Sequence, residues 1–320
     1  MFTKKVVTIR VNKEHAIPTY LYKKYWLTNW GGQVRRPDIS SHWQHYLEQS
    51  HTSKISSGYK VSINGLASYT NFSLLNLAKF IIIFPQLLFL TLRYAINTEI
   101  LKAIFKISYR QHRFLDFDLL RQALALNFVI RNTEKDIKHV AIIGDGFGNL
   151  GALISFVLPN CKISFINLGE NLFLDALSMH TIHPVANLHG LVSSNKISAQ
   201  KYNYLESTCL MAISAVDVYF NIASFGEMNK TTIDRYFNWM KENAAPLCYL
   251  YSCNREEKIH PDGSIFFYAN LPFYILQPIS RVEELCPWHQ KYPTVRFPFF
   301  KKFDGPVLHT VVKFENNKSA

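Results

Sequence analysis

The sequence lacks the patterns of a disulfide-rich or zinc-binding protein. Its five cysteines are scattered and odd in number, and none forms a CxxC pair. Neither a disulfide framework nor a zinc ribbon is therefore predicted. No secretory signal pattern, internal repeat or low-complexity run is present either. We expect a reduced, cytoplasmic protein whose cysteines are core thiols.

Acidic residues are scarce in the first part of the chain. Residues 1–140 contain 20 lysines and arginines against eight acidic residues, whereas residues 141–320 contain 15 of each. The whole net charge of +12 therefore belongs to the N-terminal part. This asymmetry indicates an anionic partner, such as a nucleotide- or lipid-linked sugar or a membrane surface, or else a solvated basic face. No basic and aromatic residues alternate at a nucleic-acid-binding spacing, so no nucleic acid partner is expected.

The chain also lacks an uncharged run long enough to predict a membrane span. The longest candidate, FIIIFPQLLFLTL, covers 13 residues between Lys79 and Arg93, and Pro85 interrupts it. A helix that crosses a bilayer needs about 20 apolar residues. The pattern predicts a buried helix pair with a break near Pro85. Docking at a membrane surface is the alternative, because basic residues flank the run on both sides.

Strand-like and helix-like segments alternate after about residue 130. The expected strands are residues 140–143, 162–168, 201–205, 217–222, 247–251 and 306–314, and the expected helices are residues 150–158 and 231–243. We expect the second helix to have a threonine cap at its start and an apolar face of Ile233, Phe237 and Met240. A strand is also expected at Val6–Val11, followed by long helical patterns up to about Ile130. The alternation predicts an α/β fold with a mostly parallel sheet and helices on both faces. We divide the chain into a basic, mainly helical segment (1–130) and a second domain (131–320).

The first strand after the boundary ends in a glycine-spaced loop, VAIIGDGFGNLGAL. Gly144, Gly146 and Gly148 form GxGxG, and Gly151 follows in the next helix. Glycines at this place allow positive φ and let a ligand approach the backbone closely. Counted from Gly146, the spacing also matches the dinucleotide fingerprint GxGxxG. The loop alone does not choose between a dinucleotide and another nucleotide-like cofactor.

The second strand ends at a position suited to binding a ribose. Asn167 lies at the strand end and Glu170 just beyond it. A ribose needs a hydrogen-bond acceptor about 20 residues after the glycines. Glu170 can accept hydrogen bonds from both ribose hydroxyls, and Asn167 from one. Alternatively, Glu170 is an acidic residue that stabilises the start of the next helix.

Three blocks of sequence resemble one known family. IIGDGFGNLGAL, INLGENLFL and DVYFNIASFGEMN are similar to motifs of the sugar O-methyltransferases, a bacterial family of class I S-adenosylmethionine-dependent enzymes. The resemblance covers roughly residues 135–260. It implies a Rossmann-like class I methyltransferase sheet, S-adenosyl-L-methionine as cofactor, and methyl transfer to a sugar hydroxyl.

The second block departs from the family pattern at one position in particular. Asn167 stands where the family has aspartate, and Gly169 where it has proline. An amide does not match a carboxylate in a charge-assisted contact with two hydroxyls. Three consequences are open: Glu170 takes over the ribose contact, the affinity for cofactor is reduced, or the domain is a degenerate one with little activity.

The resemblance and the chain order together assign site residues. The cofactor residues are Gly144, Asp145, Gly146, Gly148, Asn167, Glu170 and Asn221. The substrate residues are Ser224, Asn254 and Arg255. Glu227 is the expected catalytic base that accepts the hydroxyl proton. For Glu227 the alternative is a salt bridge or a helix cap, for Asn221 and Ser224 the satisfaction of backbone groups, and for Asn254 and Arg255 a solvated loop.

Histidines gather in MHTIHPVANLH (His180, His183 and His189) and in SHWQHY (His42 and His45). No carboxylate beside them completes a metal-ligand set, so no metal is predicted and surface or hydrogen-bonded roles are expected. Pro184 follows His183 and biases it away from a helix.

The sequence therefore predicts an O-methyltransferase that acts on a sugar or a nucleotide- or lipid-linked glycan during surface glycan or lipopolysaccharide biosynthesis. Residues 1–130 would form its lid and acceptor-binding segment, with peripheral contact at the inner membrane face as a possible addition. An NAD(P)-dependent sugar oxidoreductase is the runner-up, disfavoured because no YxxxK pair follows the fourth strand. A non-catalytic, membrane-associated protein on a degenerate methyltransferase fold is the third interpretation.

Overall fold

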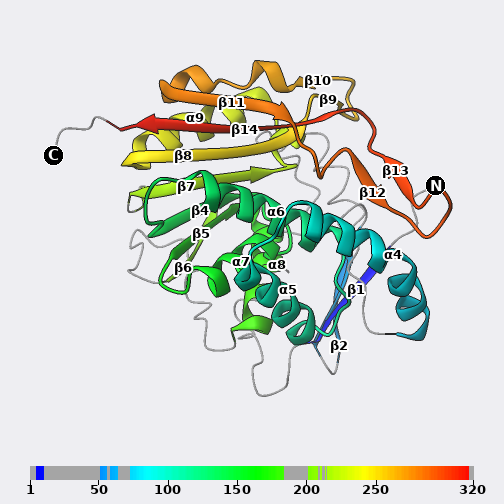
Figure 1. The fold of residues 1–320 in the computed structure, drawn as a ribbon. Coiled ribbons are helices and arrows are strands. Elements are labelled where there is room, and N and C mark those ends of the chain that lie inside the picture. The colour runs from blue at the N-terminus through cyan, green and yellow to red at the C-terminus, as the bar shows by residue number, and fades with distance from the viewer. Residues whose placement is uncertain are drawn as a thin grey trace.

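A seven-stranded sheet forms the centre of the molecule, with the strand order β11-β14-β8-β7-β4-β5-β6 (Figure 1). The computed structural model describes residues 5–10, 51–55, 58–63, 73–183, 201–207, 210, 213 and 215–316. The parallel strands are β4 (His139–Ile143), β5 (Lys162–Asn167), β6 (Tyr202–Glu206), β7 (Val216–Ile222) and β8 (Ala244–Arg255). β14 (Val307–Glu315) is antiparallel to β8, and β11 (Pro278–Leu285) is antiparallel to β14.

The central strands are the apolar runs of the sequence. All five residues of β4 are buried, as are the first six of β7. Such continuous burial is typical of a parallel strand that is covered on both faces. Each of the six strands expected after residue 130 is present, with ends shifted by a few residues. The strand expected at Val6–Val11 is β1 (Lys5–Arg10), which lies in a separate three-stranded sheet with β2 (His51–Ile55) and β3 (Gly58–Ile63).

Helices cover both faces of the sheet. Val140 and Ile142 pack into a core shared with α5 (Thr98–Arg110), α6 (Phe117–Asn132), α7 (Asn149–Val157) and α8 (Gly169–Ile182). Ala141 and Ile143 point to the opposite face, into a second core with α9 (Lys230–Asn243). The predicted α/β class, a Rossmann-like sheet with helices on both faces, is confirmed.

The predicted cap of α9 is wrong by two residues. The expected cap was the threonine at 231, but the helix begins at Lys230 and Asn229 caps it. The Asn229 side-chain oxygen accepts the Thr232 N–H at 2.8 Å. Asparagine is at least as good a cap as threonine, so the earlier residue takes the position. The expected apolar face of this helix, with Ile233, Phe237 and Met240, is buried.

The predicted helix break at Pro85 is also wrong. A single helix, α4, runs from Leu74 to Arg93 with Pro85 inside it. The proline ring removes the hydrogen bond to the carbonyl of Ile81, but both residues lie on the exposed side, where water reaches that carbonyl. Nor is the helix buried, since only Leu87 and Leu90 are covered. In length and composition α4 now meets the requirements of a membrane-crossing helix.

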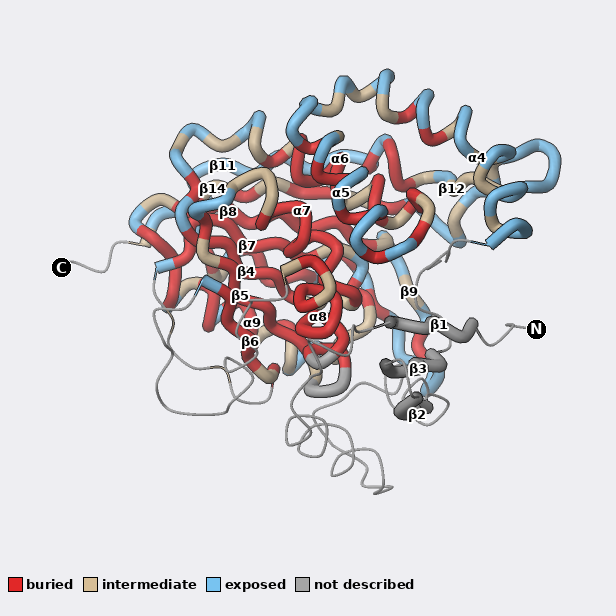
Figure 2. The backbone as a smooth tube through the Cα atoms, turned by 90° about the horizontal axis from the view of Figure 1, so that it is seen from below, coloured by how far each residue is buried: buried red, intermediate tan, exposed pale blue. Residues whose placement is uncertain are grey.

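The boundary predicted near residue 130 coincides with the end of α6. However, α5 and α6 pack directly on α7, and their buried side chains belong to the same core as those of β4 and α8. Figure 2 shows this continuous buried interior and, at its margin, the largely exposed α4. Two short hairpins complete the described fold: β9 (Glu257–Ile259) with β10 (Ile265–Phe267), and β12 (Lys291–Pro293) with β13 (Phe300–Lys302).

Candidate active site

The predicted site residues gather at the carboxyl ends of β4, β5, β7 and β8. From β4 the chain passes through α7 to β5 on one side, and it later returns to add β7 on the other side of β4. The gap between β4 and β7 is therefore the topological switch point of the sheet. Open α/β sheets bind their ligands at such a point, outside the carboxyl ends of the strands.

The loop after β4 has the backbone that the glycine spacing predicted. Gly144, Gly146 and Gly148 all have positive φ, between 62° and 82°. A Cβ on Gly144 would overlap the Ser224 hydroxyl, so the loop packs tightly against the end of β7. A Cβ on Gly151 would overlap the ring of Phe165, so this fourth glycine brings α7 close to β5.

Asp145 caps the helix that follows the loop. Its carboxylate accepts the backbone N–H groups of Leu150 at 3.1 Å and Gly151 at 2.8 Å. Burial raises the pKa of Asp145 to about 6, while these helix N–H groups oppose the rise. In this arrangement the carboxylate points back into the protein, and the loop offers its backbone rather than this side chain to the outside.

Asn167 is held by the carboxylate of Asp175, a residue that was not predicted to belong to the site. Its amide nitrogen donates to Oδ2 of Asp175, in α8, at 3.0 Å. The other oxygen of Asp175 accepts the N–H of Gly148 at 2.9 Å. Burial and the nearby Asp145 raise the pKa of Asp175 well above its ordinary value. An aspartate at 167 would place a third carboxyl in this cluster without a donor, which explains the amide at this position.

The half-buried part of the loop contains backbone N–H groups that no described residue accepts. Residues 144–146 are half-buried, and no hydrogen bond joins the N–H groups of Asp145 and Gly146 to the described residues. Glu170 lies in the first turn of α8, adjoining the end of β5. The side chain of Glu170 lies outside what the structure describes, so its predicted contact with a ribose stays a prediction.

Asn221, Ser224 and Asn254 form one buried network at the ends of β7 and β8. The Asn221 amide nitrogen donates to Oγ of Ser224 at 2.7 Å, and its oxygen accepts from Nδ2 of Asn254 at 2.9 Å. Asn221 and Ser224 both donate to the carbonyl of Ile143, the last residue of β4. The network fixes the β7 end against the start of the glycine loop. The structure thus brings these predicted residues together and gives them backbone and mutual partners.

Glu227 lies in a short turn that follows β7, on the rim of the site. Its carboxylate forms an ion pair of 2.8 Å with Lys258 of β9, and both side chains are mostly covered. The carbonyl of Gly226 accepts from Nε2 of His260 at 2.9 Å, which fastens the turn to the same hairpin. Arg255, at the end of β8, is half-buried, and its positive charge helps to lower the pKa of His289. The salt bridge named as an alternative for Glu227 is present, and it does not exclude a role in proton transfer.

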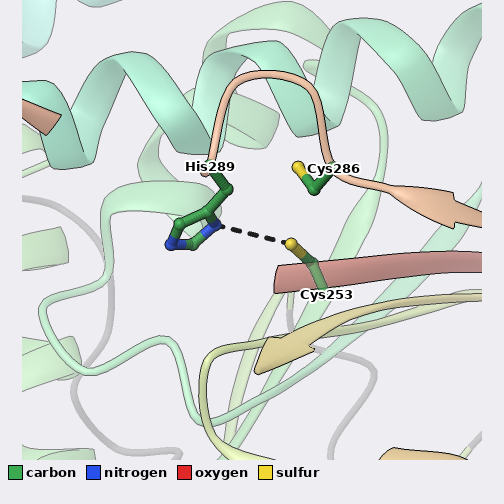
Figure 3. A group of neighbouring side chains, drawn as sticks. All are labelled: Cys253, Cys286 and His289. Atoms are coloured by element: carbon green, nitrogen blue, oxygen red, sulfur yellow. Dashed lines mark hydrogen bonds between the residues drawn. The ribbon is translucent and has the colours of Figure 1, made fainter. Parts of the chain in front are cut away.

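A second group of polar and sulfur-bearing side chains lies on the other face of β8. Cys253, Cys286 and His289 are buried, and their ligand atoms lie within 4.8 Å of one another (Figure 3). Nδ1 of His289 is 3.5 Å from the Cys253 sulfur, and Nε2 contacts the guanidinium of Arg121. A guanidinium only donates, so Nε2 accepts and Nδ1 carries the proton. The nitrogen that faces the sulfurs therefore has no lone pair to offer a metal in this arrangement.

Some of the other histidines and cysteines lie within the described residues, and some lie outside them. His183 ends α8, as expected before Pro184, and its Nε2 lies 2.8 Å from Oγ of Ser155. Burial, Arg110 and Lys201 lower the pKa of His183 to about 4. The four described cysteines are buried free thiols, as expected. His42, His45, His189 and Cys209 lie outside the described residues.

Two of the site residues had little signal in the sequence. Asp175 stands in an apolar helix segment, FLDALSM, where a lone acid was the only hint of a buried hydrogen-bonding role. Lys258 stands in a charged stretch, EEKIH, that gave no reason to pair it with Glu227. The contacts of Asp175 with Gly148 and of Lys258 with Glu227 depend on folding that brings separate segments together.

Comparison with known proteins yields similarity at the level of solved structures. No protein-family model matches the chain, and no curated protein matches it. A SAM-dependent methyltransferase from Aquifex aeolicus is 14% identical and aligns over 59% of this chain and 89% of its own, with a TM-score of 0.36. An O-methyltransferase family protein from Burkholderia thailandensis is 10% identical over 63% of this chain and 59% of its own, with a TM-score of 0.39. The plantazolicin methyltransferase, solved with SAH, is 12% identical over 62% and 82%, with a TM-score of 0.36. With TM-scores this low, these similarities carry no conclusion of their own, and the description of the fold rests on the strand order given above.

Proposed function

We propose that this protein is an S-adenosylmethionine-dependent O-methyltransferase that methylates a sugar hydroxyl. The observation that carries the proposal is the loop of left-handed glycines at the switch point of a sheet in which antiparallel β14 separates β8 from β11. In the dinucleotide-binding order the sixth strand follows the fifth directly. The inserted antiparallel strand therefore disfavours the NAD(P)-dependent oxidoreductase.

We assign two parts of the chain to the proposed cofactor. The backbone N–H groups of Asp145 and Gly146 are open to a ligand at the end of β4. Glu170 would hold the ribose hydroxyls, because Asn167 is already bound to Asp175. S-adenosylmethionine, when bound, supplies a methyl group that its sulfonium has already activated.

The protein's part in the reaction is to orient the sugar hydroxyl and to accept its proton. Glu227 is the proposed acceptor, since it is a carboxylate on the rim of the site after β7. Lys258 holds this carboxylate in place and balances its charge. Arg255, at the end of β8, is the proposed partner for a phosphate of a nucleotide- or lipid-linked acceptor. The sugar class is supported by the resemblance of the SFGEMN segment.

The first experiment is calorimetric titration of the purified protein with S-adenosylhomocysteine and with NADH. The proposal expects binding of the first and none of the second. Binding of NADH alone would favour the oxidoreductase. Binding of neither would favour a non-catalytic protein, an interpretation for which the engaged Asn167 is the specific observation.

The second experiment separates binding from chemistry. Glu227→Gln should leave S-adenosylhomocysteine affinity unchanged and reduce methyl transfer by about a hundredfold or more, the usual contribution of a general base. Glu257→Gln, on an exposed carboxylate of the same hairpin as Lys258, is the matched control and should keep its activity. If Glu227→Gln retains full turnover, another group accepts the proton.

A further inference from the structure

The outer surface of α4 is apolar, and the part of the chain that the structure describes does not cover it. Nine of its large hydrophobic side chains are exposed, with Leu74 at 87% and Leu92 at 70%. Between these two residues Lys79 is the only charged side chain. A helix that is hydrophobic on all sides is normally buried in a protein core or in a membrane. Because only Leu87 and Leu90 are buried by the protein, most of this apolar surface needs another environment.

The inner side of α4 is fastened to the folded protein. Phe80 stacks on Phe114 with ring centres 5.1 Å apart, and Leu87 and Leu90 belong to the main core. At the C-terminal end, Tyr94 packs edge-on against Trp288 and donates its hydroxyl hydrogen bond to a backbone carbonyl. These contacts extend from Phe80 to Tyr94, just past the C-terminal end of the helix. A helix held in this way lies along the protein surface and does not cross a bilayer.

The charges around α4 are positive. Residues 73–110 contain five lysines and arginines against a single acid, Glu99. Lys79 and Arg93 are exposed, one in each half of the helix. Arg93 also lines a cavity of about 250 Å³ with Lys291 and aromatic residues that include Trp288. An apolar face combined with cations is the pattern of a helix that lies in the interface of an anionic membrane.

We propose that α4 seats this protein flat on an anionic phospholipid bilayer, with its outer apolar face at the boundary between headgroups and acyl chains. The 20-residue helix provides about 30 Å of contact along the membrane plane. Lys79 and Arg93 bind lipid phosphates from the level of the headgroups. The inference is independent of the proposed reaction, because vesicle binding and S-adenosylhomocysteine binding are measured separately.

The test is co-sedimentation of the full chain with vesicles of phosphatidylcholine, with and without phosphatidylglycerol. We expect binding to the anionic vesicles that is at least about tenfold tighter than binding to phosphatidylcholine alone. A variant with Leu75→Glu, Ile82→Glu and Phe89→Glu, which lie on one exposed side of α4, should lose at least about tenfold in affinity for the anionic vesicles.

The matched control carries the same three charges elsewhere. Ile279→Glu, Val282→Glu and Leu285→Glu replace apolar side chains of β11 that are exposed to a similar degree. This control should bind vesicles like the unmodified protein. All substituted positions are exposed, and urea unfolding of each variant checks that the fold is kept. Lys79→Glu with Arg93→Glu should remove the preference for phosphatidylglycerol.

Several results would overturn the proposal. Absence of vesicle binding by the unmodified protein, or equal binding by the α4 variant and the β11 control, would do so. If sedimentation equilibrium shows a dimer that the α4 variant dissociates, the face is covered by a second copy. If alkaline carbonate leaves the protein in the membrane fraction, the helix is inserted across the bilayer and the flat seating is wrong.

Discussion

The hydrogen bond between Asn167 and Asp175 explains why an amide replaces the acid that the family pattern has at this position. Asn167→Asp tests that explanation directly. The new carboxyl would lie where Nδ2 now sits, 3.0 Å from an oxygen of Asp175 and close to Asp145. Burial and like charge both raise the pKa of such a carboxyl in the folded state.

The size of the effect depends on pH. A group whose pKa is raised on folding destabilises the protein once the pH exceeds its unfolded pKa, and the loss grows until the folded pKa is passed. Below about pH 4 the new carboxyl is protonated in both states and can donate to Asp175. A rise of about two pH units in its pKa would lower the free energy of unfolding by about 3 kcal/mol at pH 7.5.

The assay is urea unfolding of Asn167→Asp and the unmodified protein at about pH 5 and pH 7.5. We expect a loss at the higher pH that shrinks at the lower one. The swapped pair Asn167→Asp with Asp175→Asn restores one donor and one acceptor and should recover most of the stability. Equal stability of the single variant at both pH values, or no recovery in the swap, would refute the reasoning.

Three further outcomes follow from packing and protonation. Gly151→Ala places a methyl group against the ring of Phe165 and should lower the free energy of unfolding by about 1–3 kcal/mol. In the control Gly226→Ala, the added methyl group has its nearest neighbour 3.6 Å away, so the free energy of unfolding should change little. Equal urea midpoints of the two variants would contradict this. Asp217→Ala removes a carboxylate that accepts two backbone N–H groups at 2.8 Å, and urea unfolding should show a loss of about 3 kcal/mol. Burial and Arg121 hold the pKa of His289 well below its ordinary value, so ¹⁵N NMR at pH 6 should show a neutral ring with the proton on Nδ1. An imidazolium signal at pH 6 would exclude that arrangement.

The sheet was predictable because burial leaves a strong mark on sequence. β4 and β7 are continuous apolar runs, and α9 has its apolar residues on one face. β11 left no such mark. It is exposed along its length and mixes Arg281, Glu283 and Glu284 with apolar residues, so its place depends on pairing with β14.

The course of α4 could not be predicted from the sequence alone. Proline inside a helical pattern ordinarily predicts a break. Whether it breaks the helix depends on whether the carbonyl it leaves unpaired is buried. That carbonyl, at Ile81, lies on the exposed side, and only the packing of Leu87 and Leu90 reveals which side that is.

The site was predictable in position but not in its contacts. The glycine loop and Asn167 lie where the sequence placed them, at the ends of β4 and β5. The partners of Asn221 and Asn254 depend on the register of β7 against β8, which sequence spacing does not encode. The predicted roles of Glu227 and the cofactor residues stay predictions until the titrations and variants above are measured.

The core that α5 and α6 share with α7 has a consequence for how this chain can be divided. Ile104, Leu120 and Leu124 are fully enclosed on the same side of the sheet as Leu153. A fragment that starts at residue 131 would leave an uncovered apolar surface over α7 and would aggregate. The two helices are thus part of the smallest unit that folds, and α4, which packs on α6, cannot be exchanged between proteins as a separate module. Engineering of this protein has to begin from a piece that includes α5.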